Sequence, residues 1–168
     1  IAVVFWALVI PLWLRHKWPI SGVFGVLIGA VVLVPTWLAM AQLRAISPSI
    51  LLATMAVVWV ADIAAYFAGR AFGKHKLAPN ISPGKTWEGA AGALVGVMIY
   101  GMLVRPLMQL DNMRSSVWVL VLLVITAVSI VGDLFESLLK RKAGIKDSSN
   151  VLPGHGGVLD RIDSLTST

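Results

Sequence analysis

Long apolar runs separated by short charged segments dominate this sequence and constrain its fold more than any other feature. The hydrocarbon layer of a membrane is about 30 Å thick, and about 20 apolar residues are needed to cross it as a helix, the conformation that satisfies its own backbone groups in lipid. Hydrophobic residues make up 58% of the chain and charged residues 13%, which leaves too little polar surface for a water-soluble globule. We therefore expect an all-α, polytopic integral membrane bundle with four complete spans at 18–43, 45–69, 89–110 and 117–132.

The two ends of the chain differ from these spans. Residues 1–14 are apolar but too short to cross a membrane, and they lack the basic start and small-residue cleavage site of a signal peptide, so we interpret them as a helix fragment. Ile1 is not an initiator methionine, and only residues 164–168 follow Asp163, so we expect a single membrane-embedded domain over 1–168 that is truncated at both ends. Cysteine is absent, which excludes disulfides and thiolate metal ligands.

The basic residues predict the orientation of the spans. All lysines and arginines except Arg44, Arg105 and Arg114 follow alternate apolar runs. Because basic loops of membrane proteins stay on the cytoplasmic side, the net charge of +6 indicates topology and not nucleic-acid binding. We place the loops at 15–18, 70–88 and 138–163 in the cytoplasm.

Three carboxylates lie inside or at the end of apolar runs. Asp62 lies within one, and Asp133 and Glu136 lie near the end of another, where an unpaired charge costs several kcal/mol. In a helix Asp133, Glu136, Ser137 and Lys140 share one face, which would bring carboxylates and an ammonium together. The alternative is structural: Asp133 or Glu136 pairs with Lys140 at the membrane surface, and Asp62 pairs with a lysine elsewhere in the bundle.

The loop at 70–88 contains Gly84-Lys85-Thr86, which resembles part of a phosphate-binding P-loop. A P-loop needs a preceding β-strand and a glycine where this chain has Pro79, so that motif is excluded. We instead predict Ser82 to be the N-cap of the next helix, with Lys85 and Thr86 as donors to a phosphate. A simple helix start without a phosphate site explains the same residues.

The densest polar segment runs from Ser137 to Asp163. Its basic residues can neutralise a polyphosphate, its glycines allow close approach of the backbone to a ligand, and its carboxylates suit Mg²⁺. Such a layout is typical of phosphoryl or nucleotidyl transfer. In chain order the segment contains Lys140, Arg141, Lys146, Asp147, His155, Asp160, Arg161 and Asp163.

This segment resembles, at every defined position, the signature of the phosphatidate cytidylyltransferase family, whose members are also called CDP-diacylglycerol synthases. The matching positions are Ser137, Lys140-Arg141, Lys146-Asp147, Pro153-x-His155-Gly-Gly157 and Asp160-Arg161-x-Asp163. The segments from Asp62 to Lys74 and from Ser82 to Gly89 are similar to that family as well, so the resemblance covers residues 55–168. It implies a nucleotidyltransferase of phospholipid biosynthesis that converts CTP and phosphatidic acid into CDP-diacylglycerol and pyrophosphate.

The resemblance also implies cofactors, residue roles and a location. Mg²⁺ is expected on Asp133 and Asp160, together with a second cation for which K⁺ is the candidate. The other expected catalytic residues are Lys140, Arg141, Asp147, His155 and Asp163, and the expected substrate-binding residues are Asp62, Ser82, Lys85, Thr86, Glu88, Lys146 and Arg161. His155 fits equally a donor to the leaving group and a residue that orders its loop. The expected location is the bacterial cytoplasmic (inner) membrane, with the active site facing the cytoplasm, a homodimer as the family's assembly and no nucleic-acid partner.

Two other functions fit parts of the sequence. A CTP-dependent polyprenol or lipid kinase would use the same nucleotide but transfer its terminal phosphate. An ion- or proton-coupled transporter would use Asp62, Asp133 and Glu136 inside the membrane. The acidic residues gather toward one side instead of tracing a path across, which favours an enzyme.

Overall fold

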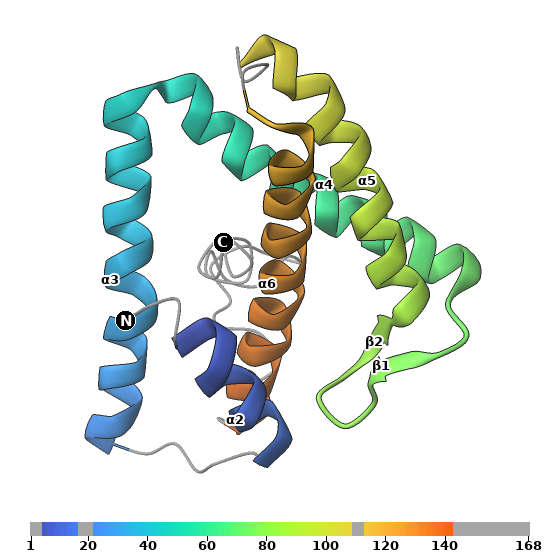
Figure 1. The fold of residues 1–168 in the computed structure, drawn as a ribbon. Helices are drawn as coiled ribbons and strands as arrows, with labels where there is room; N and C mark the ends of the chain where they lie inside the picture. Colours follow the sequence, from blue (N-terminus) through green and yellow to red (C-terminus); the bar gives the residue numbers. More distant parts are fainter. Residues whose placement is uncertain (1–4, 17–21, 109–112, 143–168) are drawn as a thin grey trace, which may run out of the picture. The chain divides into compact units, whose positions relative to one another are not determined.

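The computed structural model describes residues 5–16, 22–108 and 113–142, and this part of the chain is mostly helical (Figure 1). Within these described residues, four helices are long and apolar enough to cross a membrane, which confirms the expected polytopic, all-α integral membrane protein. The elements in chain order are the π-helical turn η1 (Phe5–Val9), α2 (Ile10–His16), α3 (Gly22–Ile46), α4 (Pro48–Phe72), β1 (Lys76–Ala78), β2 (Ser82–Thr86), α5 (Trp87–Leu107) and α6 (Ser115–Lys142).

Helix α6 extends further into the polar part of the sequence than the span predicted at 117–132. Helix α6 continues through Lys142, so its last turn contains the basic residues that we had placed in the loop at 138–163. The reason is that Leu134, Phe135 and Leu138 are buried on one side of this extension, which stabilises it beyond the apolar run. Basic residues at the end of a helix also interact favourably with its dipole.

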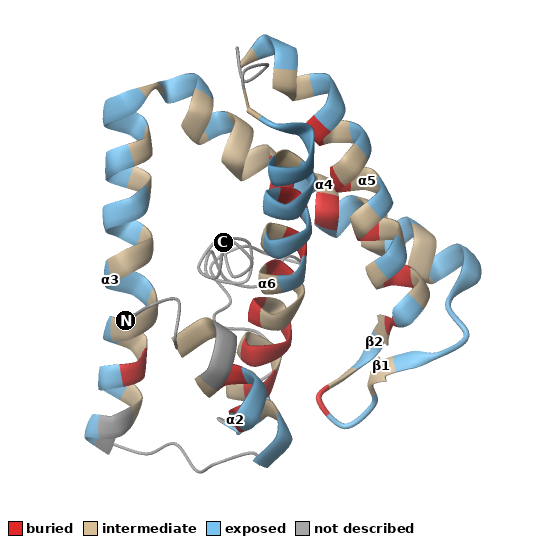
Figure 2. Cartoon of the chain, in the orientation of Figure 1, coloured by how far each residue is buried: buried red, intermediate tan, exposed pale blue. Residues whose placement is uncertain are grey.

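The chain divides into two compact units, residues 40–127 and residues 1–39 with 128–168. In the unit 40–127, α4 and α5 pack closely through small residues. A Cβ atom added at Gly92 would overlap the Cβ of Ala68, and one added at Gly96 would lie 2.7 Å from the Cβ of Ala64. Buried residues recur every four positions along α5, at Gly89, Ala93, Val97 and Gly101 (Figure 2). Small residues at such an interface let two membrane helices approach closely.

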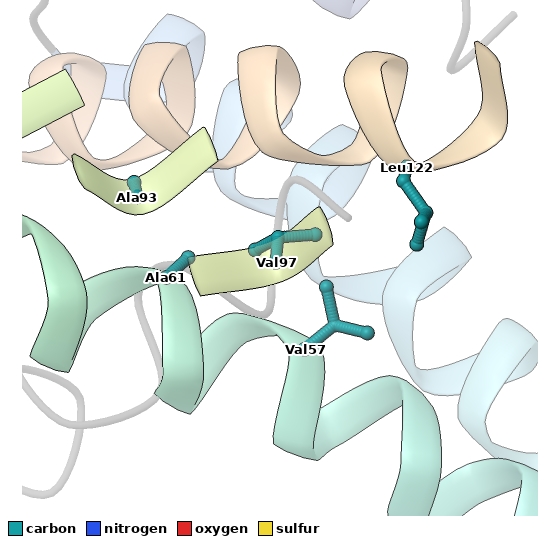
Figure 3. Packing of buried hydrophobic residues seen from close by; sticks show 5 residues of the cluster. All are labelled: Val57, Ala61, Ala93, Val97 and Leu122. Atoms are coloured by element: carbon teal, nitrogen blue, oxygen red, sulfur yellow. The ribbon is translucent and has the colours of Figure 1, made fainter. Parts of the chain in front are cut away.

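The core of this unit joins α4, α5 and α6. Its five buried side chains are Val57, Ala61, Ala93, Val97 and Leu122 (Figure 3). Two hydrogen bonds to main-chain carbonyls accompany the apolar contacts: the Tyr100 hydroxyl donates to Ala53 O at 3.0 Å, and Trp118 Nε1 donates to Gly101 O at 3.1 Å. The three helices of this unit are therefore joined by both packing and polar contacts.

In the other unit, the N-terminal apolar stretch packs on the end of α6. The ring of Phe135 is the centre of an aromatic cluster, with ring centroids 5.6 Å from Trp13, 6.1 Å from Trp6 and 6.4 Å from Phe5, all edge to face. Trp13 and Phe135 are almost fully buried. Such aromatic pairs contribute about 0.5–1.5 kcal/mol each beyond the area that they bury. The cluster therefore holds the segment of α6 that carries Asp133 and Glu136.

Candidate active site

A β-hairpin occupies most of the predicted loop at 70–88. Strands β1 and β2 are antiparallel, with Lys76 opposite Thr86 and Ala78 opposite Ser82. The turn between them is closed by a hydrogen bond from Ile81 N to Ala78 O at 3.1 Å, and Ile81 is buried. This hairpin is not among the predicted elements, although the Pro79-Asn80 pair is a turn signal that favours it.

The prediction that Ser82 caps the following helix is wrong. Ser82 is the first residue of β2, and its pairing with β1 keeps the chain extended until Thr86. Thr86 is the N-cap of α5: its backbone is extended, with φ −131° and ψ 156°, and its Oγ1 accepts a hydrogen bond from Gly89 N at 3.1 Å. A hydroxyl in this position satisfies one of the free amide groups at the start of a helix.

Thr86 is also the point where the end of α4 meets the start of α5. A Cβ atom added at Gly69 would lie 3.1 Å from Thr86 Oγ1, and one added at Gly73 would lie 2.9 Å from Thr86 Cγ2. A Cβ atom added at Gly89 would lie 3.0 Å from the main-chain oxygen of Ala65. These glycines therefore have a packing role, because side chains there would push the two helices and the hairpin apart.

Glu88, in the first turn of α5, binds the residue that precedes β1. Its Oε1 lies 2.7 Å from His75 Nδ1, and His75 N donates to both carboxylate oxygens at 3.2 Å. Beside this pair, Trp87 N donates to His75 O at 3.0 Å. Both strands of the hairpin are thus attached to the start of α5.

Other predicted residues lie near this end of the unit. Asp62 is exposed on α4, one turn before Tyr66, whose hydroxyl accepts a hydrogen bond from Arg70 Nη1 at 3.0 Å. Lys85 lies in β2 directly before the N-cap, and its Nζ atom is buried. A buried ammonium near the N-terminus of a helix gives this region two sources of positive potential.

The second group of predicted residues lies on the last turns of α6. Glu136 Oε1 is 3.1 Å from Lys140 Nζ, and both side chains are mostly buried, with 14% and 19% of their surface exposed. This confirms the structural alternative for Glu136, an ion pair with Lys140. Asp133 lies one turn before Glu136 and is half-buried, while Arg141 is exposed in the last turn. Carboxylate and cationic groups therefore share this end of α6, as the helical spacing predicts.

The sequence model of the cytidylyltransferase family matches residues 1–168. The chain belongs to the cytidylyltransferase family. It is similar to the phosphatidate cytidylyltransferases of Pseudomonas aeruginosa (48% identical over 141 residues, 83% of this chain and 52% of the relative), Haemophilus influenzae (50% over 121 residues, 70% and 42%) and Bacillus subtilis (45% over 108 residues, 64% and 40%). The chain spans about half the length of the curated relatives that it matches. The resemblance that its motifs indicate is confirmed.

The remaining predicted site residues of this cytidylyltransferase-family chain lie outside the residues that the structure describes. They are Lys146, Asp147, His155, Asp160, Arg161 and Asp163. Among the residues that the structure describes, no three His, Cys, Asp or Glu side chains form a group that could hold a metal ion. Mg²⁺ in phosphate-transfer sites usually takes one or two carboxylates and completes its shell with substrate phosphates and water. The single carboxylate of Asp133 fits that chemistry, and its pairing with Asp160 stays a prediction.

Proposed function

We propose that this chain is the catalytic part of a phosphatidate cytidylyltransferase, which transfers CMP from CTP to phosphatidic acid. The products are CDP-diacylglycerol and pyrophosphate. The observation that carries the proposal is the similarity to phosphatidate cytidylyltransferases, at 45–50% identity over 108 to 141 residues. The polar signature from Ser137 to Asp163 supports it, because it combines the cationic and carboxylate groups that nucleotidyl transfer needs.

The location of the polar groups fits a reaction between a lipid and a nucleotide. Arg70 and Lys85 lie at the junction of α4 and α5, and Lys140 and Arg141 lie in the last turn of α6. Phosphatidic acid keeps its acyl chains in the bilayer, whereas CTP arrives from water. We place these helix ends at the cytoplasmic surface of the bacterial inner membrane, because they are the basic ends.

The reaction needs little acid–base chemistry from the protein. An oxygen of the phosphatidate phosphate, already ionised at neutral pH, attacks the α-phosphorus of CTP and forms a new P–O bond. The bond from the α-phosphorus to the bridging oxygen breaks, and pyrophosphate leaves with that electron pair. Positioning and charge neutralisation then dominate catalysis. We assign neutralisation of the substrate phosphates to Lys85, Lys140, Arg141, Lys146 and Arg161.

The cofactor and assembly proposals rest on the resemblance to the family. Asp133 and Asp160 would hold Mg²⁺, which when bound supplies further positive charge to the phosphates. A second cation, with K⁺ as the candidate, and a homodimer belong to the same proposal. Asp163, Asp147 and His155 are assigned to the same site.

Product identity tests the proposed reaction. Purified full-length protein, given phosphatidic acid, CTP and Mg²⁺ in mixed micelles, should release pyrophosphate and form CDP-diacylglycerol. Release of CDP with a newly phosphorylated lipid would instead show a lipid kinase. Absence of turnover with every nucleotide would favour a transporter.

Asp133→Asn tests the assigned metal ligand. We expect turnover to fall by at least about a thousandfold, because an amide is a poor Mg²⁺ ligand, while the thermal unfolding temperature stays unchanged. Asp111→Asn is the matched control, since Asp111 is the one acidic residue that the charge pattern assigns to the opposite side of the membrane. Turnover near the normal rate in Asp133→Asn would contradict the assignment.

A further inference from the structure

His75 has no assigned role, yet its main chain and its ring both contact the same side chain. One carboxylate, that of Glu88, accepts from its main-chain nitrogen through both oxygens and also meets its ring at 2.7 Å. The main-chain oxygen of His75 in turn accepts from Trp87 N at 3.0 Å. His75 is therefore held to the start of α5 through its nitrogen, its oxygen and its ring.

The location of His75 at the end of the strand pairing explains why a carboxylate binds its main-chain nitrogen. The strand pairing of the hairpin continues by one hydrogen bond beyond Lys76 and Thr86, from Trp87 to His75. Because β2 ends at Thr86 and α5 begins at Trp87, β2 offers no further main-chain acceptor to the amide of His75. The Glu88 side chain takes the place of that acceptor, because it projects from the first turn of the helix toward the end of the strand.

The pair adds little to stability by itself. The His75 side chain is 78% exposed and that of Glu88 is 24% exposed. Contacts between exposed polar side chains contribute little to stability, because water screens them and two side chains lose freedom. The larger effect of the pair is geometric, because it fixes the start of β1 against the first turn of α5.

The attachment of the hairpin to α5 also constrains Lys85. It lies in β2 between the exposed Gly84 and the buried Thr86, and its own Nζ atom is buried. Thr86 is anchored on one side by its hydrogen bond to Gly89 N, and β1 is anchored on the other side by the pair of His75 and Glu88. The backbone of Lys85 is therefore held between two fixed points.

We propose that His75 and Glu88 are positioning residues that attach the hairpin to α5 and so hold Lys85 in place for an anionic phosphate group. This inference rests on the proposed function, in which Lys85 offsets substrate charge. It assigns a role to His75, and it gives Glu88 an indirect role in place of a contact with substrate.

Steady-state kinetics of the full-length enzyme with CTP and phosphatidic acid test the proposal. Glu88→Ala removes all three contacts, whereas His75→Ala removes only the ring contact. We expect kcat/KM to fall about tenfold or more in Glu88→Ala and about threefold in His75→Ala, because small displacements of a binding group reduce rates strongly. The thermal unfolding temperature should change little in either variant. Lys74→Ala, an exposed neighbour with no assigned role, is the control and should keep normal kinetics.

A second comparison distinguishes positioning from direct contact with substrate. If Glu88 acts through Lys85, Glu88→Ala should add less than about twofold to the loss already caused by Lys85→Ala, since residues that act as a unit are not additive. Full additivity of the two losses, or normal kinetics in Glu88→Ala, would overturn the inference. A parallel fall in unfolding temperature and activity would also overturn it, because it would show a purely structural role.

The outcome for the proposed function is separate. Failure of the unmodified enzyme to form CDP-diacylglycerol would contradict the proposed reaction itself. A fully active enzyme whose kinetics do not respond to Glu88→Ala would leave the reaction intact and contradict only the role of the pair.

Discussion

At the scale of single residues, Thr86 shows how one side chain can join three elements. It ends β2, caps α5 and leaves no room for a Cβ atom at two glycines near the end of α4. The Gly84-Lys85-Thr86 sequence suggests a phosphate loop at first sight, but the hydroxyl of Thr86 is directed to Gly89 N and is buried. The start of the helix thus explains the role of this hydroxyl, and phosphate binding in this segment stays a proposal for Lys85.

Thr86→Val tests the capping role. Valine has nearly the same shape but cannot accept the hydrogen bond from Gly89 N, so we expect a loss of about 1 kcal/mol in unfolding free energy. The measurement is thermal or denaturant unfolding in detergent without nucleotide, which separates stability from any effect on binding.

The same substitution at Thr54 is the matched control. The Thr54 hydroxyl donates to Ile50 O at 2.9 Å inside α4, where that oxygen also accepts the helical hydrogen bond. Its removal should therefore cost much less than the removal of the Thr86 hydroxyl. Equal losses in the two variants would contradict the capping role of Thr86.

At the scale of elements, the sequence predicts the long helices well and the hairpin poorly. The four spans follow from the length of the apolar runs, because lipid leaves few other conformations for them. The hairpin depends on contacts between residues distant in sequence, such as His75 with Glu88, which local patterns do not reveal. The continuation of α6 beyond the span predicted at 117–132 likewise depends on a distant contact, since burial of Phe135 against Trp13 stabilises it.

In the candidate site, too, features set by local helix geometry are predicted correctly and those set by distant contacts are not. Helical spacing predicts correctly that Glu136 and Lys140 meet on one face, because neighbours in a helix are fixed by local geometry. The N-cap at Thr86 could not be deduced locally, because the start of α5 depends on the pairing of β2 with β1.

The packing of α4 on α5 gives a prediction at this scale. Gly92→Ala places a methyl group against Ala68 and 3.0 Å from the main-chain oxygen of Ala64, so the helices must separate. We expect a loss of about 1–3 kcal/mol in unfolding free energy, typical of overpacking in a tight interface.

Gly29→Ala, in α3, is the control for this substitution, because a Cβ atom there meets nothing within 4 Å. Alanine has the higher helix propensity, so this variant should be as stable as the parent or more stable by up to about 1 kcal/mol. Denaturant unfolding of both variants in the same detergent makes the comparison. Equal stability of Gly92→Ala and the parent would show that α4 and α5 are not packed this tightly.

At the scale of the whole molecule, the distribution of basic residues and the proposed use of CTP favour the same orientation of the helices in the membrane. The ends of α4 and α6 carry basic side chains, and the hairpin adds Lys76 and Lys85 between α4 and α5. CTP is made and kept in the cytoplasm, so a CTP-dependent reaction requires these ends to face that compartment. The proposed function therefore requires the topology that the positive-inside rule predicts.

Single cysteines introduced on either side of α5 test this orientation, because this chain contains no cysteine of its own. Asn80→Cys lies in the exposed turn of the hairpin before α5, and Ser116→Cys lies in the exposed first turn of α6 after it. In a cysteine-free full-length background, a membrane-impermeant maleimide should label Asn80→Cys only in inside-out vesicles and Ser116→Cys only in intact spheroplasts. Labelling of both from the same side would contradict the crossing of the membrane by α5. The reverse pattern would keep that crossing but place the hairpin and the end of α6 away from CTP, which would contradict the proposed cytoplasmic site.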